Sequence, residues 1–345
     1  MRIFRSNDSR LDRVCAAATA AVLALAGILP ATAARAAELI PFKMGVSAPV
    51  VAVLPVYLAE DGGFYRKQGL KVDIISMEGG TRGVQVLLSG EIQAMHVGLS
   101  PVVAANAQGA DIRAVASSTN TLPITIFTAK QSNPPLPKGS TIGISTFGSE
   151  TDIALTLALK ALGLKREDMT ITQIGGTTQR FAAMVAGRID AAPMLEPATT
   201  AAKQKGFVPV YDLSAAKTPW IFDAVVVTSS YLKQHADTLT HFLMAYIEGA
   251  YWGLTEEAKA KEVIAQRFKT KDSVVIDATY AEFKRLMPLD VKPSVEGARN
   301  VIDNLQQTDV KIASRKVEDY VDLSLVENLR KTGFFADLQR RYGIK

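Results

Sequence analysis

Two stretches of the sequence decide the fold: GGTRGVQVLLSGEIQA at residues 79–94 and GGTTQRFAAMVAGRIDA at residues 175–191. Each begins with Gly-Gly-Thr, which suits the start of a helix. Each continues through a helical stretch to a turn of small residues, Ser89-Gly90 in the first copy and Ala186-Gly187 in the second. Each then enters an apolar run. The chain therefore contains two copies of one structural unit.

The similarity extends outward from these stretches. Gly45-Val46-Ser47 and Gly143-Ile144-Ser145 open the two copies, and the strand-like runs Lys71–Ile75 and Thr170–Ile174 precede the two Gly-Gly-Thr segments. The copies lie just under a hundred residues apart. Alternation of strand and helix is typical of parallel α/β layers. The sequence therefore predicts an α/β fold with two Rossmann-like lobes.

The connection between the lobes is predicted at two strand-like runs, Ile124–Ala129 and Phe222–Thr228. The resulting boundaries are residues 38–128 for the first part of lobe I, 129–222 for lobe II and 223–345 for the return to lobe I and a helical C-terminal tail. From about Ser229 onward apolar residues recur at helical spacing. Two crossings would form a hinge that allows the lobes to open and close about a cleft.

The N-terminal residues have the pattern of a secretory signal peptide. Arginines precede an apolar run from Val14 to Leu29, and the small-residue stretch Ala31–Ala37 follows. We expect residues 1–37 to be removed, with cleavage within Ala33–Ala37, and the protein to act in the periplasm. A retained membrane anchor is the alternative. Cys15, the only cysteine, would leave with the peptide, which excludes disulfides from the mature protein.

Composition excludes several other functions. Without residues 1–37, Lys+Arg falls from 39 to 34 and Asp+Glu from 34 to 32, which leaves a net charge of +2. No basic cluster with interleaved aromatic residues remains, so nucleic acid is not an expected partner. The histidines, His96, His235 and His241, have no zinc-site spacing. We expect no metal, no cofactor and no catalytic residues, and a monomeric protein.

Small and hydroxylated residues gather where a ligand would bind. In open α/β sheets that place is beside the carboxyl ends of the strands, where helices begin and their N–H groups favour an anion. Many of the same residues could serve only as helix caps. The candidate ligand-binding residues are Ser47, Ala48, Pro49, Gly80, Thr81, Leu99, Ser100, Thr119, Asn120, Phe147, Gly148, Ser149, Thr177, Thr178 and Glu196.

Two arginines, Arg82 and Arg180, lie just inside the Gly-Gly-Thr helices. Either could bind an acidic ligand through two parallel hydrogen bonds, although a solvent-exposed position is the more common one for such an arginine. Phe147 and Trp220 are candidates for a stacking wall, with core packing as the alternative. Glu196 could accept a hydrogen bond from a ligand or cap its own helix.

Several phrases resemble the periplasmic substrate-binding proteins of ABC transporters in the nitrate/sulfonate/taurine group, whose relatives include proteins that bind thiamine-pyrimidine precursors. The resemblance covers about Phe42 to Val227, and its phrases are Pro55–Tyr65, Gln68–Val72, Gly90–Ala94 and Gly187–Ala192. It implies a type II periplasmic-binding fold with the ligand between two hinged lobes. The ligand loops of that group correspond here to Ser47–Val50, Gly80-Thr81, Leu99-Ser100, Thr119-Asn120, Phe147–Ser149 and Thr177-Thr178. Gln93 and His96 depart from the common pattern of the group.

The expected function is therefore capture of a small organic ligand, such as a sulfonate or carboxylate, and its delivery to the membrane permease of an ABC importer. Ligand would favour the closed state because both lobes contact it there. A neutral heteroaromatic ligand is the main alternative. An enzyme related to thiamine-pyrimidine synthesis and a ligand-presenting sensor are alternative functions, and the absence of a mature cysteine disfavours the enzyme.

Overall fold

Two five-stranded sheets organise the computed structural model, which describes residues 38–307, 312 and 316–344. From residue 39 onward the described chain forms one compact unit. The predicted signal peptide, including Cys15, lies outside the described residues. No helix in the described ranges is long and apolar enough to cross a membrane.

The first sheet has the strand order β2-β1-β3-β10-β4. Strand β1 pairs in parallel with both β2 and β3, and β10 runs antiparallel between β3 and β4. Its strands are β1 (Ile40–Val46), β2 (Leu70–Ser76), β3 (Ala94–Val97), β4 (Ile112–Thr121) and β10 (Pro219–Thr228).

The second sheet has the order β7-β6-β8-β5-β9. Strand β6 pairs in parallel with β7 and β8, and β5 runs antiparallel between β8 and β9. Its strands are β5 (Thr125–Thr128), β6 (Thr141–Ile144), β7 (Thr170–Gln173), β8 (Ala191–Met194) and β9 (Val208–Asp212). The two sheets correspond strand for strand, which confirms the predicted α/β class and the internal repeat.

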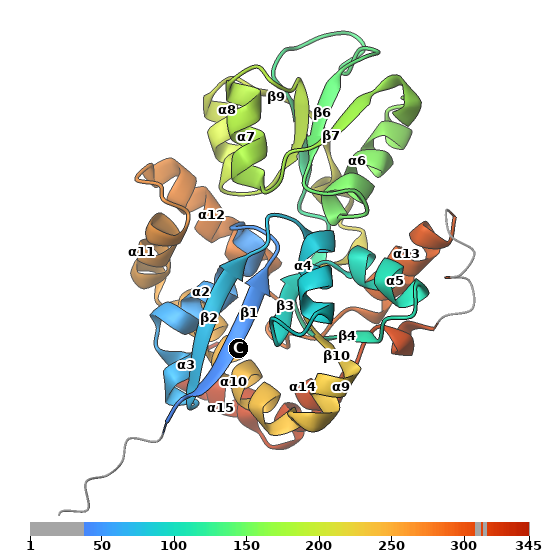
Figure 1. The fold of residues 1–345 in the computed structure, drawn as a ribbon. Coiled ribbons are helices and arrows are strands. Elements are labelled where there is room, and N and C mark those ends of the chain that lie inside the picture. The colour runs from blue at the N-terminus through green and yellow to red at the C-terminus, as the bar shows by residue number, and fades with distance from the viewer. Residues whose placement is uncertain (1–37, 308–311, 313–315, 345) are drawn as a thin grey trace, which may run out of the picture. The chain divides into compact units, whose positions relative to one another are not determined.

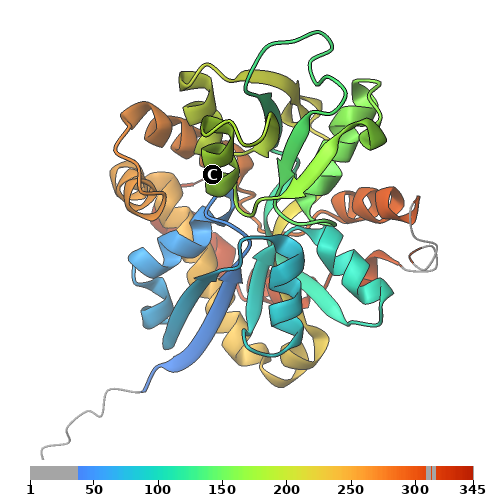
Figure 2. The same cartoon turned by 45° about the horizontal axis from the view of Figure 1, so that its top comes forward.

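Helices connect the strands in both halves, and the repeated Gly-Gly-Thr segments begin the matching helices α4 (Gly80–Leu88) and α7 (Thr177–Val185). Figures 1 and 2 show the two α/β bodies, which we call the first and second lobes after their sheets. The other helices of these halves are α2 (Leu54–Asp61), α3 (Phe64–Lys67), α5 (Leu99–Ala107), α6 (Glu150–Ala161) and α8 (Ala198–Gln204).

The chain crosses between the sheets earlier than predicted. Strand β5 belongs to the second sheet, so the first crossing is the short segment 122–124 and not the boundary at 128/129. The second crossing lies at 213–218, before β10 returns to the first sheet, and not at 222/223. The difference arises because β5 pairs with β8 and β9 of the second sheet, whereas β10 pairs with β3 and β4 of the first. The two crossings contact each other through a 3.0 Å hydrogen bond from the Leu213 N–H to the Ile124 carbonyl.

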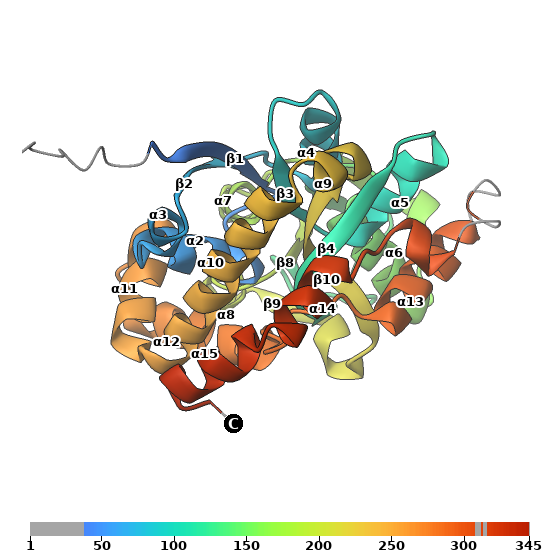
Figure 3. The ribbon, with the colours of Figure 1, turned by 90° about the horizontal axis from the view of Figure 1, so that it is seen from below.

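The C-terminal tail packs mainly on the first sheet (Figure 3). One apolar core joins the two: the ring of Phe42 in β1 stacks on Phe242 at 4.7 Å, and Tyr65 stacks on the same ring at 5.1 Å. The second lobe has two smaller cores of its own. The tail helices are α9 (Ser229–Gln234), α10 (Ala236–Thr255), α11 (Glu257–Arg267), α12 (Ser273–Leu286), α13 (Val295–Gln306), α14 (Ser324–Lys331) and α15 (Phe334–Tyr342).

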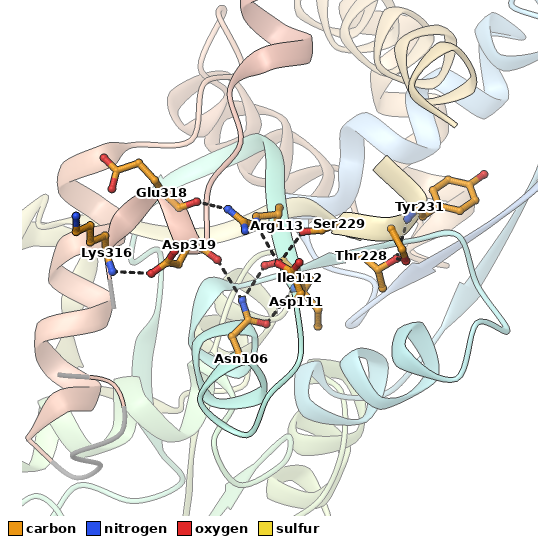
Figure 4. Close-up of polar contacts among 11 residues, drawn as sticks. Asn106, Asp111, Ile112, Arg113, Thr228, Ser229, Tyr231, Lys316, Glu318 and Asp319 are labelled. Atoms are coloured by element: carbon orange, nitrogen blue, oxygen red, sulfur yellow. Dashed lines mark hydrogen bonds and ion pairs between the residues drawn. The ribbon is translucent and has the colours of Figure 1, made fainter. Parts of the chain in front are cut away.

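A polar network fixes the tail to the start of β4 (Figure 4). The Asn106 side chain donates to the Ile112 carbonyl at 2.9 Å and accepts from the Ile112 N–H at 3.0 Å. Ser229, at the start of α9, donates to Asp111 at 2.7 Å and accepts from Arg113 at 3.1 Å. Arg113 also donates to the carbonyl of Glu318. These bonds are remote from the carboxyl ends of β1 and β3, so they serve the scaffold.

Gly249 allows α10 to pack directly on the backbone of α2. A Cβ atom at Gly249 would lie 2.6 Å from the Cα and N atoms of Ala59, which cannot rotate away. We expect Gly249→Ala to lower the free energy of unfolding by about 1–3 kcal/mol, the usual cost of overpacking. The control is Gly253→Ala on the same helix, where the new atom would meet only the flexible end of Leu58. Urea denaturation should show a clearly smaller loss for the control, and equal losses would contradict this account.

Candidate ligand-binding site

A cavity with a volume of about 50 Å³ lies where the carboxyl ends of the strands of both lobes meet. Residues of both lobes form its wall: Ser47, Ala48, Val50, Gly79, Gly80, Val97, Gly98, Pro101, Ser145, Ser149, Glu150, Thr151, Thr177, Arg180, Leu195, Phe222 and Asp223. Five predicted ligand-binding residues, Ser47, Ala48, Gly80, Ser149 and Thr177, are among them. A wall drawn from two lobes suits a ligand that is enclosed between them.

The local structure explains why these residues converge. Ser47 follows β1, Gly98 follows β3 and Ser145 follows β6, so each lies at the carboxyl end of a parallel strand. Helices α4 and α7 begin at Gly80 and Thr177, with their first N–H groups at the same edge. Helix starts from both lobes therefore add positive potential to one cavity.

Arg180 gives the cavity a buried positive charge. The residue is only 1% exposed, and its guanidinium donates to the carbonyls of Pro193 and Gly175 at 3.1 and 2.6 Å and to the Thr177 hydroxyl at 2.8 Å. All three of these partners are neutral oxygens. Burial lowers the pKa of Arg180 to about 9, which leaves it charged at neutral pH. Since isolated buried charges are costly, Arg180 is suited to an anion that completes the pair.

Two buried carboxyl groups form another part of the wall. Glu150 accepts from the Ser100 N–H at 2.7 Å and from the indole Nε1–H of Trp220 at 2.8 Å. Burial raises the pKa of Glu150 to about 7, although both hydrogen bonds oppose the change. Asp223, in β10, is 1% exposed. Glu150 repels an anion when it is ionised, so Arg180 is the group on this wall that suits the acidic end of a ligand.

Asp223 lies next to a buried group of polar side chains. His96 Nδ1 lies 2.8 Å from Asp223 Oδ1, out of line for a hydrogen bond, and His96 Nε2 lies 3.1 Å from the Tyr246 hydroxyl. The Ser118 hydroxyl is 3.4 Å from the same Nε2 atom. Burial raises the pKa of Tyr246 far above its ordinary value, so this hydroxyl stays protonated. None of His96, Tyr246 and Ser118 lines the cavity. His96, which departs from the common pattern of the resembling group, therefore contacts a lining residue, Asp223, but not the ligand space itself.

Three predicted site residues, Thr81, Phe147 and Gly148, do not line the cavity. Thr81 donates across the lobes to the Phe147 carbonyl at 2.9 Å. The Phe147 side chain is 49% exposed, so it is neither a buried stacking wall nor part of the core. Gly148, the next residue, donates its N–H to Asp152 at 2.9 Å.

The remaining predicted residues also lie outside the cavity wall. Asn120 binds the start of α13 through Lys292 and Ser294, and Glu196 caps its own helix through Thr200. Leu99, Ser100 and Thr119 are fully buried, and Thr178 faces a separate groove beside α8 and α12. Pro49 lies between two lining residues without lining the cavity itself.

Three important lining residues were missed or misjudged by sequence reasoning. Arg180 was expected to be solvent-exposed more often than buried, and that expectation was wrong. Glu150 and Asp223 were not proposed at all. Glu150 begins a helix directly after the loop Phe147–Ser149, which could have indicated it. Asp223 is the acidic residue within the apolar run Phe222–Thr228, which is an unusual place for a charge. Trp220 is buried and bonds Glu150, so its candidate role as a stacking wall is not supported.

The described residues contain no group of three or more His, Cys, Asp or Glu side chains placed to hold a metal ion.

Comparisons with known proteins identify the family and the fold of the chain. Residues 51–260 match the family model described as NMT1/THI5 like. The "Putative binding protein YtlA" of Bacillus subtilis is 23% identical over 241 residues, which is 67% of this chain and 72% of that protein.

Two solved structures show the same fold. The alkanesulfonate-binding protein SsuA of Xanthomonas axonopodis pv. citri, bound to MOPS, is similar with a TM-score of 0.67 and 20% identity, covering 83% of this chain and 99% of that one. The periplasmic nitrate-binding protein NrtA of Synechocystis is similar with a TM-score of 0.71 and 14% identity, covering 87% and 91%. At these identities the likeness establishes the periplasmic-binding fold.

Proposed function

The chain belongs to the NMT1/THI5-like family, and on that premise we propose that it is an extracytoplasmic solute-binding protein of an ABC importer. It captures a small organic anion, a sulfonate or a carboxylate, between its two lobes and presents it to a membrane permease. The relatives that are named as sulfonate- and nitrate-binding proteins support this proposal by their shared fold.

One observation carries the choice of an anion: Arg180 is a fully buried cation on the cavity wall whose protein partners are neutral oxygens. A sulfonate or carboxylate would accept charge-assisted hydrogen bonds from this group. The starts of α4 and α7 at the same edge add to the attraction. A neutral ligand would leave the buried charge without compensation.

Binding and lobe closure are coupled in this proposal. Ligand contacts residues from both lobes, so it stabilises the arrangement in which the lobes are together. The two crossings at 122–124 and 213–218 are the only covalent connections between the sheets within the described chain, and they form the hinge. The permease then recognises the closed form.

The test is a thermal-shift screen of the purified protein against sulfonates, carboxylates, nitrate and neutral pyrimidines. A ligand at 100 times its Kd should stabilise the protein by about 2.7 kcal/mol, which is several degrees for a chain of this size. NMR of each hit before and after incubation shows whether the compound is chemically unchanged. We expect saturable shifts from sulfonates or carboxylates that are recovered intact. Shifts from pyrimidines alone, or consumption of the hit, would contradict the proposal.

A further inference from the structure

Glu150 belongs to the second lobe, but its carboxylate binds the first. The residue begins α6, and its Oε1 accepts the Ser100 N–H in the first turn of α5 at 2.7 Å. Its Oε2 accepts the indole N–H of Trp220, in β10, at 2.8 Å. Both donors belong to the first lobe. The residue is 7% exposed, so water competes little for these bonds.

The first lobe contains a notch that fits this side chain. Gly98 precedes α5, and a Cβ atom there would lie 2.1 Å from Cγ of Glu150 and 2.4 Å from Oε1. The backbone of Gly98 has φ −68° and ψ 164°, a conformation that any residue can adopt. A side chain at position 98 would displace the Glu150 carboxyl group from its place, so glycine here leaves the space that Glu150 occupies.

Glu150 is not the only buried contact between the lobes: the Val51 N–H donates to the Glu196 carbonyl at 3.0 Å, and Ala154, Ala158 and Leu195 pack on the apolar core of the first lobe. Three further side-chain bonds between the lobes lie at the surface. Thr81 with the Phe147 carbonyl, Glu78 with Gln179 and Gln204 with Asp272 are hydrogen bonds among exposed groups. Surface bonds of this kind contribute little because water competes for both partners. Glu150 accepts two hydrogen bonds in a buried place, and one of them satisfies an N–H at the positive end of a helix. Both bonds are charge-assisted when the carboxyl group is ionised.

We propose that Glu150 is a positioning residue that fastens the second lobe to the first and so preorganises the closed cleft before ligand arrives. The α5 amide is already occupied by this internal carboxylate, so the acidic group of the ligand is left with Arg180. The inference rests on the proposed function only in that ligand binds between the lobes. Preorganisation raises affinity because less of the binding energy is spent on closure.

The experiment measures the distance between the lobes without ligand. With Cys15, the only cysteine of the chain, replaced by Ser, spin labels are attached at Gln85→Cys in α4 and Arg188→Cys in the second lobe, both exposed positions. Double electron-electron resonance then gives the distance distribution. We expect one short distance for the parent. Glu150→Ala should shift the population toward longer distances, with the ratio of closed to open protein falling at least tenfold.

Two further variants make the result specific. Gly98→Ala acts from the opposite lobe by filling the notch and should reproduce the Glu150→Ala distribution. Glu196→Gln alters a carboxylate that also lies at a helix start of the second lobe but bonds only Thr200 in its own helix, so it should match the parent. Unchanged distributions in Glu150→Ala and Gly98→Ala, with both variants folded by circular dichroism, would overturn the inference. A flat ligand screen would instead contradict the proposed function and leave these distances unaffected.

Discussion

Replacing Arg180 with Gln is expected to weaken binding of the anionic ligand at least 100-fold. A hydrogen bond to a charged group contributes about 1.5–3 kcal/mol, and a guanidinium can make two to one sulfonate or carboxylate. Loss of two such bonds exceeds the roughly 2.7 kcal/mol that corresponds to a factor of 100. Isothermal titration calorimetry with the best hit of the ligand screen measures the change. Arg180→Lys should also bind weakly, because an ammonium lacks the planar pair of donors.

The chain offers a control in Arg82, which also lies near the start of a Gly-Gly-Thr helix, in the position that corresponds to Thr178, but is exposed. Arg82→Gln should leave the affinity within about twofold of the parent protein, since exposed charges are solvated and screened. Arg180→Gln also removes donors from the carbonyls of Pro193 and Gly175, so its folding is checked by denaturation. A folded Arg180→Gln variant with parental affinity would show that the buried cation is not the anion site.

Local sequence patterns were sufficient to predict the architecture. The Gly-Gly-Thr segments at Gly79 and Gly175 open matching helices, and the two sheets have corresponding strand orders. The crossings were misplaced because the membership of a strand depends on its partners in space. Thr125–Thr128 reads as a strand in either lobe, and only its pairing with Met194 and Asp212 assigns it to the second sheet.

The site was predictable only in part, for a related reason. Ser47, Gly80 and Thr177 were found because helix starts and strand ends have local sequence signals. Asn120 was misplaced because its amide bonds Lys292 and Ser294, which lie more than 170 residues away along the chain. Arg180 shows the same limitation: its burial depends on β8, through the carbonyl of Pro193, and cannot be read from the helix that contains it.

Glu150 should give the protein an unusual dependence of stability on pH. Its pKa is about 7 in the folded protein against an ordinary 4.5, mainly because burial disfavours the charged form and Asp223 adds repulsion. The folded state therefore holds a proton that the unfolded state has already released. The favourable contribution is fully present below pH 4.5 and is lost as pH rises through about 7. The difference between the two pKa values corresponds to about 3 kcal/mol in the free energy of unfolding.

The measurement compares the free energy of unfolding of the ligand-free parent and of Glu150→Gln from pH 4.5 to 8. Relative to the variant, the parent should lose about 3 kcal/mol across this range, because Gln cannot titrate and every other group is shared. Glu248, whose pKa is lowered by Lys67 and Arg341, stabilises the fold as pH rises at the acidic end, and it does so equally in both proteins. The groups facing Glu150 are the Ser100 amide, the Trp220 indole and Asp223, and Arg180 lies on the same cavity wall. All of these groups are present in both the parent and the Glu150→Gln variant. Parallel stability curves would show that water reaches this carboxylate in solution, and a solvated Glu150 could not hold the lobes together.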